Sequence, residues 1–80
     1  MESQSLGRIV RYHRDRAGLS RKDLATIAGV GKTVIYDIEH GKETVQLRSL
    51  LKVLHALNIS MQVDSPLMEG YHAETNKGNP

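Results

Sequence analysis

The sequence predicts a small all-α domain of four to five short helices, followed by one β-strand. Three observations support this fold class. Apolar residues recur at helical spacing in four separate stretches, glycines follow three of these stretches, and an alternating apolar segment follows the fourth. Because 80 residues can bury only one small core, residues 1–64 are expected to form a single domain and residues 65–80 a flexible tail without regular structure.

The first two helices follow from apolar spacing and capping. The first helix is expected from about Ser5 to Ala17, and Gly18 should end it. Ser20 and Asp23 have the three-residue spacing of a capping box, so a second helix should begin there and end at Gly29. The expected apolar faces are Leu6, Ile9, Val10, His13 and Ala17 in the first helix, and Leu24, Ile27 and Ala28 in the second.

A third helix should follow the tripeptide 29–31, with Gly31 as its N-cap, and should end near Gly41. Its apolar residues are Val34, Ile35 and Ile38. Two short helices joined by so tight a turn must cross steeply. The second and third helices are therefore predicted to form a helix-turn-helix.

A fourth helix is expected from about Gln46 to Leu57, with a broad leucine stripe that closes the core and Asn58 as its C-cap. The residues that follow alternate in polarity, which predicts a strand with Ile59, Met61 and Val63 on its apolar side. Nothing else in the chain can pair with this strand. The segment is therefore either a loop or a strand that pairs with its copy in a homodimer, where these three side chains form the dimer contact.

Composition excludes several classes of function. The chain has no cysteine, which excludes disulfides, thiolate zinc sites and cysteine nucleophiles. The four histidines lack metal-ligand spacing, and no nucleophile, base and orienting group can be assembled, so no enzyme activity, metal or cofactor is expected. No apolar run reaches membrane-spanning length and the N-terminus lacks a secretory signal, so we expect a cytoplasmic protein without a membrane partner.

Charge is distributed unevenly along the chain. The net charge is +2, but residues 1–48 carry nine basic and six acidic side chains, a net +3, whereas residues 49–80 carry −1. A polyanionic partner should therefore meet the N-terminal part of the chain, although such a charge run is also typical of a solvated helix face.

The third helix has the layout of a helix that reads DNA. Its isoleucines face inward, whereas Lys32, Thr33, Tyr36 and Asp37 point away from the core near the helix N-terminus. A recognition helix needs this interleaving, because one face packs on its own domain while the other enters a major groove. A carboxylate near phosphates is repelled, so Asp37 must accept from cytosine N4 or pair with a neighbouring cation.

The stretch LSRKDLATIAGVGKTVIYDIEHGK, residues 19–42, resembles the lambda-repressor/Cro (XRE) family of helix-turn-helix proteins, and the resemblance covers residues 5–59. The matching positions are Leu19-Ser20, Leu24-Ala25, Gly29-Val30, Ile35, Ile38-Glu39, Gly41-Lys42, Leu47 and Leu50-Leu51. Three positions depart from the family pattern, since His13 replaces a leucine, Gly31 a Ser or Thr cap, and Val45 a frequent proline.

This resemblance implies roles for eight side chains and implies double-stranded DNA as the partner. The residues that match base-reading positions are Lys32, Thr33 and Asp37, with Tyr36 beside them. The residues that match phosphate contacts are Arg21 and Lys42, and those that match a structural ion pair are Arg14 and Glu39. The protein would then act by sequence-specific binding rather than by catalysis.

The run LRSLLKVLHALNISMQVD, residues 47–64, is similar to the HipB-type antitoxin repressors, in which such a strand pairs across the dimer axis. This similarity implies a homodimer on a pseudo-palindromic operator in its own promoter, at the nucleoid of the bacterial cytosol. It also implies a HipA-like kinase toxin as a second partner. Two alternatives stay open, a stand-alone XRE-type transcriptional regulator and an inhibitory subunit that acts mainly by protein–protein binding.

Overall fold

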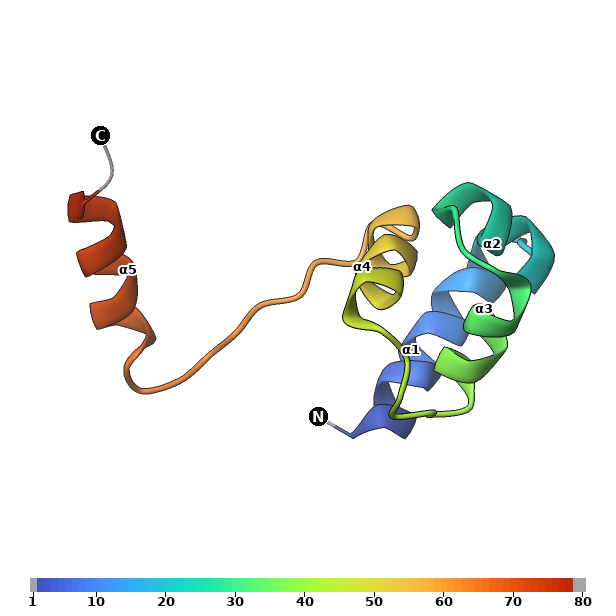
Figure 1. Ribbon diagram of the computed structural model, residues 1–80, viewed down its shortest axis with the longest axis horizontal. Helices are drawn as coiled ribbons and strands as arrows, with labels where there is room; N and C mark the ends of the chain where they lie inside the picture. The colour runs from blue at the N-terminus through green and yellow to red at the C-terminus, as the bar shows by residue number, and fades with distance from the viewer. Residues whose placement is uncertain (1, 79–80) are drawn as a thin grey trace.

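The computed structural model describes residues 2–78 and contains five helices. They are α1 (Ser3–Arg16), α2 (Arg21–Ala28), α3 (Lys32–Glu39), α4 (Leu47–Ala56) and α5 (Met68–Gly78). The first four helices pack together, whereas α5 stands apart at the end of an extended segment (Figure 1). The predicted all-α class and the predicted number of short helices are confirmed.

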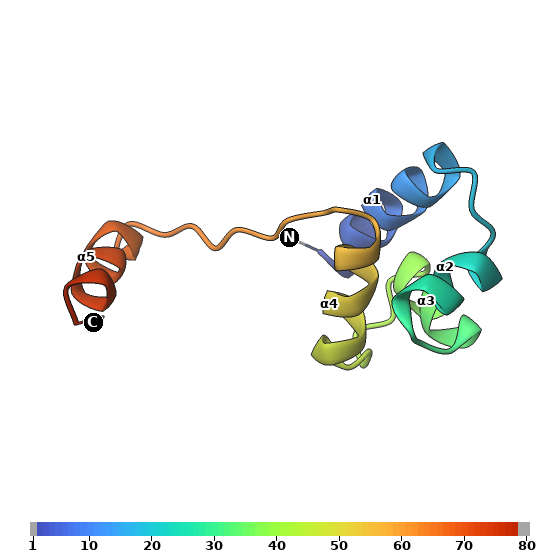
Figure 2. The same ribbon diagram turned by 90° about the horizontal axis from the view of Figure 1, so that it is seen from above.

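The core lies where α3 meets the other helices of this group. α3 contacts α1, α2 and α4, and Figure 2 shows the four helices gathered closely together. The buried apolar side chains are Val10, Leu24, Ala25, Ile35, Ile38, Val53 and Leu54. Because the core takes both isoleucines of α3, the opposite face of that helix is left to solvent.

The capping box that predicts α2 is present. The Asp23 N–H donates to Ser20 Oγ at 3.0 Å, and the Ser20 N–H donates back to Asp23 Oδ2 at 3.3 Å. At the other end, Gly29 has a φ of +73°, a left-handed conformation that glycine adopts without steric cost. These local signals set the start and end of α2, so that only residues 29–31 separate it from α3.

The apolar face of α2 differs from the predicted one. Leu24 and Ala25 are buried and Ala28 is half-buried, whereas Ile27 is 60% exposed. At 3.6 residues per turn, the first three share an arc of about 100° and Ile27 lies outside it. The placement of Ile27 on the packed face is therefore wrong, because α2 turns only that arc towards α3 and α4.

Gly7 is a buried glycine through which α1 approaches the end of α3 very closely. A Cβ built on Gly7 would lie 2.5 Å from the Ile38 carbonyl oxygen and 2.7 Å from that of Glu39. Both are backbone atoms, which cannot move aside as a flexible side chain would. The absence of a side chain at Gly7 therefore allows α1 to lie this close to the end of α3.

We expect Gly7→Ala to lower the free energy of unfolding by about 3 kcal/mol, because the added methyl overpacks a rigid backbone contact. Urea denaturation followed by circular dichroism measures this loss. Gly70→Ala in α5 is the matched control, since a Cβ there meets nothing within 4 Å. Equal stability of the two variants would contradict the close approach of α1 to α3.

α4 ends near its predicted C-terminus, but its leucine stripe divides into a buried and an exposed part. The C-cap of α4 is Leu57, one residue before the predicted Asn58, which follows it with a φ of +57° while the Ile59 N–H donates to the Leu54 carbonyl at 2.9 Å. However, Leu47 and Leu51 are 64% and 47% exposed. The prediction that the whole stripe closes the core is wrong, because these two leucines, one turn apart, lie on a face that the described chain leaves open.

Residues 59–65 are extended and form no β-strand in the single chain that the structure describes. Strand assignment requires a hydrogen-bonded partner, and none of residues 2–78 supplies one. The sequence left two alternatives for this segment, a loop or a strand paired with a second copy, and in the single chain it is a loop. Pairing with a second copy stays a proposal.

The expectation that the tail lacks regular structure is wrong for α5. Good helix formers such as Glu69, Ala73 and Glu74 outweigh the glycine at position 70. The first turn is closed by hydrogen bonds from the Met68 N–H to the Ser65 carbonyl and from the Tyr71 N–H to the Leu67 carbonyl. The polar composition of this segment gave no sign of a helix, because a helix that packs against no other element has no apolar face to reveal it.

Candidate nucleic-acid interface

The centre of the candidate site is a carboxylate shared by two arginines from different helices. Arg14 of α1 donates from Nε to Glu39 Oε2 at 2.6 Å and from Nη2 to Oε1 at 3.0 Å. Arg21, the first residue of α2, donates from Nε to the same Oε1 at 3.1 Å. The Glu39 side chain is only 1% exposed. The end of α3 is thereby tied to both preceding helices.

Burial and pairing act on the Glu39 pKa in opposite directions. Burial by itself raises the pKa of this carboxyl group, since it penalises the charged form. Hydrogen bonds from Arg14 and Arg21, together with their positive charges, outweigh burial and hold the pKa of Glu39 below its ordinary value of 4.5. The buried group is therefore a charged carboxylate at neutral pH.

Next to this network, α3 presents an aromatic and polar surface to solvent. Arg21, Lys32, Thr33 and Tyr36 line an open hollow of about 380 Å³ at the start of α2 and α3. The Arg21 guanidinium carbon lies 5.4 Å from the centre of the Tyr36 ring, within the range of a cation–π contact. The structure thus brings together four of the six predicted DNA-contacting residues.

The other two predicted DNA-contacting residues, Asp37 and Lys42, contact each other. Lys42 Nζ lies 3.4 Å from Asp37 Oδ2, and the Lys42 side chain is 56% exposed. Asp37 therefore has the neighbouring cation that the sequence required of it. The pair lies at the far end of α3 from the hollow, near the loop that leads to α4.

His40, which was not among the predicted site residues, packs against Tyr36. The two rings stack with centroids 3.8 Å apart and planes 18° from parallel. His40 Nδ1 also lies 2.8 Å from the Tyr36 carbonyl oxygen. The signal that could have revealed this contact is the spacing of four residues, which places the two rings one helical turn apart.

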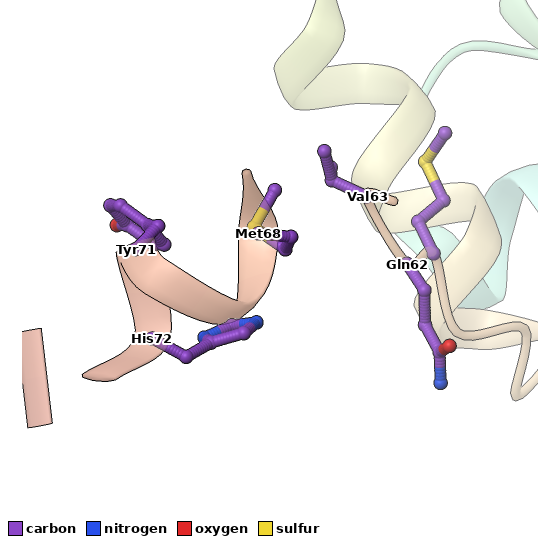
Figure 3. Close-up of a pocket in the computed structure, with 6 residues that line it drawn as sticks. Gln62, Val63, Met68, Tyr71 and His72 are labelled. Atoms are coloured by element: carbon purple, nitrogen blue, oxygen red, sulfur yellow. The ribbon is translucent and has the colours of Figure 1, made fainter. Parts of the chain in front are cut away.

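The predicted dimerisation residues do not share one environment. Ile59 is half-buried and packs against the core, whereas Met61 and Val63 are 52% and 76% exposed. Met61, Gln62 and Val63 line one side of a hollow of about 550 Å³ between the extended segment and α5, shown in Figure 3. The residues of α5 that complete it are Met68, Tyr71 and His72. In the single chain, Ile59 is therefore partly covered by the core, whereas Met61 and Val63 remain open to a partner.

No helix among the described residues combines the length and apolar character that a membrane crossing requires. Within residues 2–78, no group of three or more histidine, aspartate or glutamate side chains is placed to hold a metal ion.

The chain is similar to known helix-turn-helix proteins in sequence. The helix-turn-helix family HTH_3 matches residues 10–63. The HTH-type transcriptional regulator y4mF of Sinorhizobium fredii is 39% identical over 61 residues, which cover 76% of this chain and 80% of that protein. An HTH-type transcriptional regulator of Haemophilus influenzae is 38% identical over 50 residues, which cover 62% of this chain and 51% of that protein.

Solved structures with the same fold include two kinds of helix-turn-helix protein. The restriction-modification controller protein C.AhdI from Aeromonas hydrophila is 31% identical with a TM-score of 0.65, over 72% of this chain and 88% of that one. HipB in a complex with the O4 20mer is 21% identical with a TM-score of 0.74, over 82% of this chain and 93% of that one.

Proposed function

The chain belongs to the helix-turn-helix family HTH_3 and is a transcriptional regulator of the XRE type, and from this premise we propose that it is a dimeric, sequence-specific repressor. We further propose that it binds a pseudo-palindromic operator in its own promoter through α3. Its second role is that of an antitoxin, which neutralises a HipA-like kinase encoded beside it.

The observation that carries the DNA-binding proposal is the division of α3 into two faces. Ile35 is fully buried and Ile38 is 4% exposed, whereas Lys32, Thr33 and Tyr36 are exposed. The exposed face begins at the helix N-terminus, the part of a recognition helix that meets base edges. We assign Lys32, Thr33 and Asp37 to base contacts, with Tyr36 beside them, and Arg21 and Lys42 to phosphates.

Binding of DNA from the chain's own promoter tests this assignment. Arg21→Ala should weaken binding to all sequences alike, because a phosphate contact carries no sequence information. Lys32→Ala and Thr33→Ala should in addition reduce the preference for promoter DNA over random DNA by about tenfold. The measurement is fluorescence anisotropy titration at several salt concentrations, and the wild-type affinity should fall steeply as salt rises.

Lys52→Ala is the matched control, since Lys52 is an exposed lysine of α4 outside the helix-turn-helix. Lys52→Ala should keep the wild-type preference for promoter DNA over random DNA. If Lys32→Ala kept that preference as well, the assignment of α3 as the reading helix would be wrong.

Dimerisation through residues 59–63 is supported by the surface that the single chain leaves open. Met61 and Val63 expose apolar side chains on an extended segment, and Leu51 of α4 is also half exposed. A twofold axis would cover this apolar surface and pair the free backbone groups of the segment at the same time. The same axis should set two copies of α3 about 34 Å apart, one turn of DNA.

The antitoxin proposal is supported by the similarity of residues 47–64 to HipB-type antitoxins and by the shared fold. One of the structures with this fold is a HipA-HipB-O2-O3 complex, whose HipB chain is 21% identical to this one. The test is purification of the protein from its native operon, followed by mass spectrometry of bound protein. A kinase-fold protein encoded next to it should co-purify at a stoichiometric level.

The same purification separates the two alternatives. A stand-alone XRE-type regulator should bring down no stoichiometric partner. An inhibitory subunit that acts mainly by protein–protein binding should bring down a partner and should inhibit it equally well when Lys32→Ala has removed the operator preference.

A further inference from the structure

Arg21 is held in place from two directions. Its Nε donates to Glu39 Oε1 at 3.1 Å, and its guanidinium carbon lies 5.4 Å from the centre of the Tyr36 ring. Within residues 2–78, this Nε bond is the only hydrogen bond that the Arg21 side chain donates. The guanidinium has two further nitrogens with four N–H groups, so the anchored side chain keeps most of its donors.

Both supports of Arg21 are themselves fixed. The Glu39 carboxylate is 1% exposed and takes two hydrogen bonds from Arg14, which also donates to the Leu19 carbonyl at 3.0 Å. Tyr36 stacks on His40 with ring centroids 3.8 Å apart. The position of the Arg21 guanidinium is therefore set by side chains of α1 and α3, although the arginine itself starts α2.

We propose that Glu39 and Tyr36 are positioning residues, which hold the Arg21 guanidinium ready for a DNA phosphate before DNA arrives. Glu39 accepts a hydrogen bond from Nε, and the Tyr36 ring lies beside the guanidinium. The two outer nitrogens are left to donate to the phosphate oxygens. An anchored arginine loses less side-chain freedom on binding than a free one. This inference rests on the proposed function, because it assumes that the face around Arg21 meets DNA.

Lysine is the substitution that separates positioning from charge. It keeps the positive charge at position 21, but its single ammonium group cannot bind Glu39 in the same geometry, lie flat on Tyr36 and donate to a phosphate together. Arg16→Lys is the matched control, since the Arg16 guanidinium carbon lies 5.2 Å from the Tyr12 ring centre in a similar cation–π contact, but outside the helix-turn-helix.

The experiment measures the affinity for a random-sequence DNA duplex, which reports phosphate contacts without knowledge of the operator. We expect Arg21→Lys to lose about tenfold in affinity and to approach Arg21→Ala, while Arg16→Lys stays within about twofold of wild type. The slope of log affinity against log salt should decrease by about one for Arg21→Ala. A loss of fold stability alone would leave this slope unchanged.

A second pair of variants tests the role of the ring. Tyr36→Phe keeps the aromatic face, whereas Tyr36→Leu removes it, and neither changes the charge. On the random duplex, Tyr36→Leu should bind about threefold or more weakly than Tyr36→Phe, because only the phenylalanine keeps a ring beside the Arg21 guanidinium. Urea denaturation of both variants shows whether the folded state is retained.

The outcomes distinguish failure of the proposed DNA-binding function from failure of the positioning role of Glu39 and Tyr36. If the wild-type protein does not bind duplex DNA at low salt, the proposed function is wrong. If Arg21→Ala weakens binding but Arg21→Lys matches wild type, the phosphate contact stands and the positioning role of Glu39 and Tyr36 is wrong. If Arg21→Ala itself binds as wild type, Arg21 is no phosphate ligand and the positioning inference fails with the DNA-binding proposal intact.

Discussion

Proline at Met61 is expected to convert the protein to a monomer that binds its operator at least about a hundredfold more weakly. The reason is the loss of simultaneous contact with two half-sites, because linking two binding modules commonly multiplies affinity by a factor on the order of 10² to 10⁴. Met61→Pro removes an amide donor from the proposed strand ladder and an apolar side chain from the proposed interface together. Sedimentation velocity measures the oligomeric state.

The single chain itself should tolerate this substitution. Met61 is 52% exposed, and its N–H makes no hydrogen bond within residues 2–78. Gln62→Pro is the matched control, since alternate amides of a strand point to opposite edges and the Gln62 N–H should then point away from the partner strand. If Met61→Pro and wild type sediment as the same dimer, the segment is not the interface and the operator geometry proposed above is wrong as well.

Removal of either partner of the Arg14–Glu39 pair is expected to lower the free energy of unfolding by about 3 kcal/mol or more. Each single substitution leaves a buried charge without the partner that makes two hydrogen bonds to it, since Arg14 is 8% exposed and the Glu39 side chain 1%. Glu39→Ala also removes the partner of Arg21, so it should be the more harmful of the two. Glu43→Ala, which removes an exposed carboxylate, should change stability by less than about 0.5 kcal/mol.

A double-mutant cycle tests whether the two residues act as a unit. Arg14→Ala combined with Glu39→Ala should cost less than the sum of the two single losses, because neither buried charge of this pair is then left without the other. Strict additivity in urea denaturation would show that the pair contributes nothing as a pair.

The same carboxylate makes stability depend on pH in a definite direction. Because the pKa of Glu39 is lowered in the folded state, its contribution is fully present above the ordinary carboxyl pKa of 4.5 and is lost as the pH falls through the lowered folded value. Wild-type stability should therefore fall below about pH 4.5, and this fall should be smaller in Glu39→Gln, which has no proton to take up.

Much of the helical layout could be predicted from the sequence, because it depends on neighbours within about four residues. Ser20 and Asp23 lie three positions apart, and their capping box sets the start of α2. Asn58 ends α4 by a hydrogen bond between Ile59 and Leu54, which is equally local. The apolar period of α3 predicts its exposed face, with Lys32, Thr33 and Tyr36, whereas Arg21 and Lys42 were implied only by the family resemblance.

Which apolar residues are buried depended on the partners of each helix. Ile27, Leu47 and Leu51 fit an apolar stripe by spacing, but no helix within residues 2–78 covers them. An apolar stripe shows which face of a helix can be buried, but it does not show which other element packs against that face. α5 was missed for the converse reason, since a helix that stands apart from the domain needs no apolar stripe at all.

The first four helices, the capping box of α2, the helix-turn-helix and the family could be predicted from local sequence, whereas the contacts among the residues of the candidate site depend on how the helices pack. Arg14 and Arg21 lie 25 and 18 residues from Glu39 along the chain, and only the packing of α1, α2 and α3 brings both onto one carboxylate. The family resemblance implied the pair with Arg14, whereas the contact of Arg21 with Glu39 and Tyr36 emerged from the structure alone. Caps and periodicity depend on hydrogen bonds between near neighbours, but a shared buried charge depends on where whole helices lie, and local sequence does not specify that.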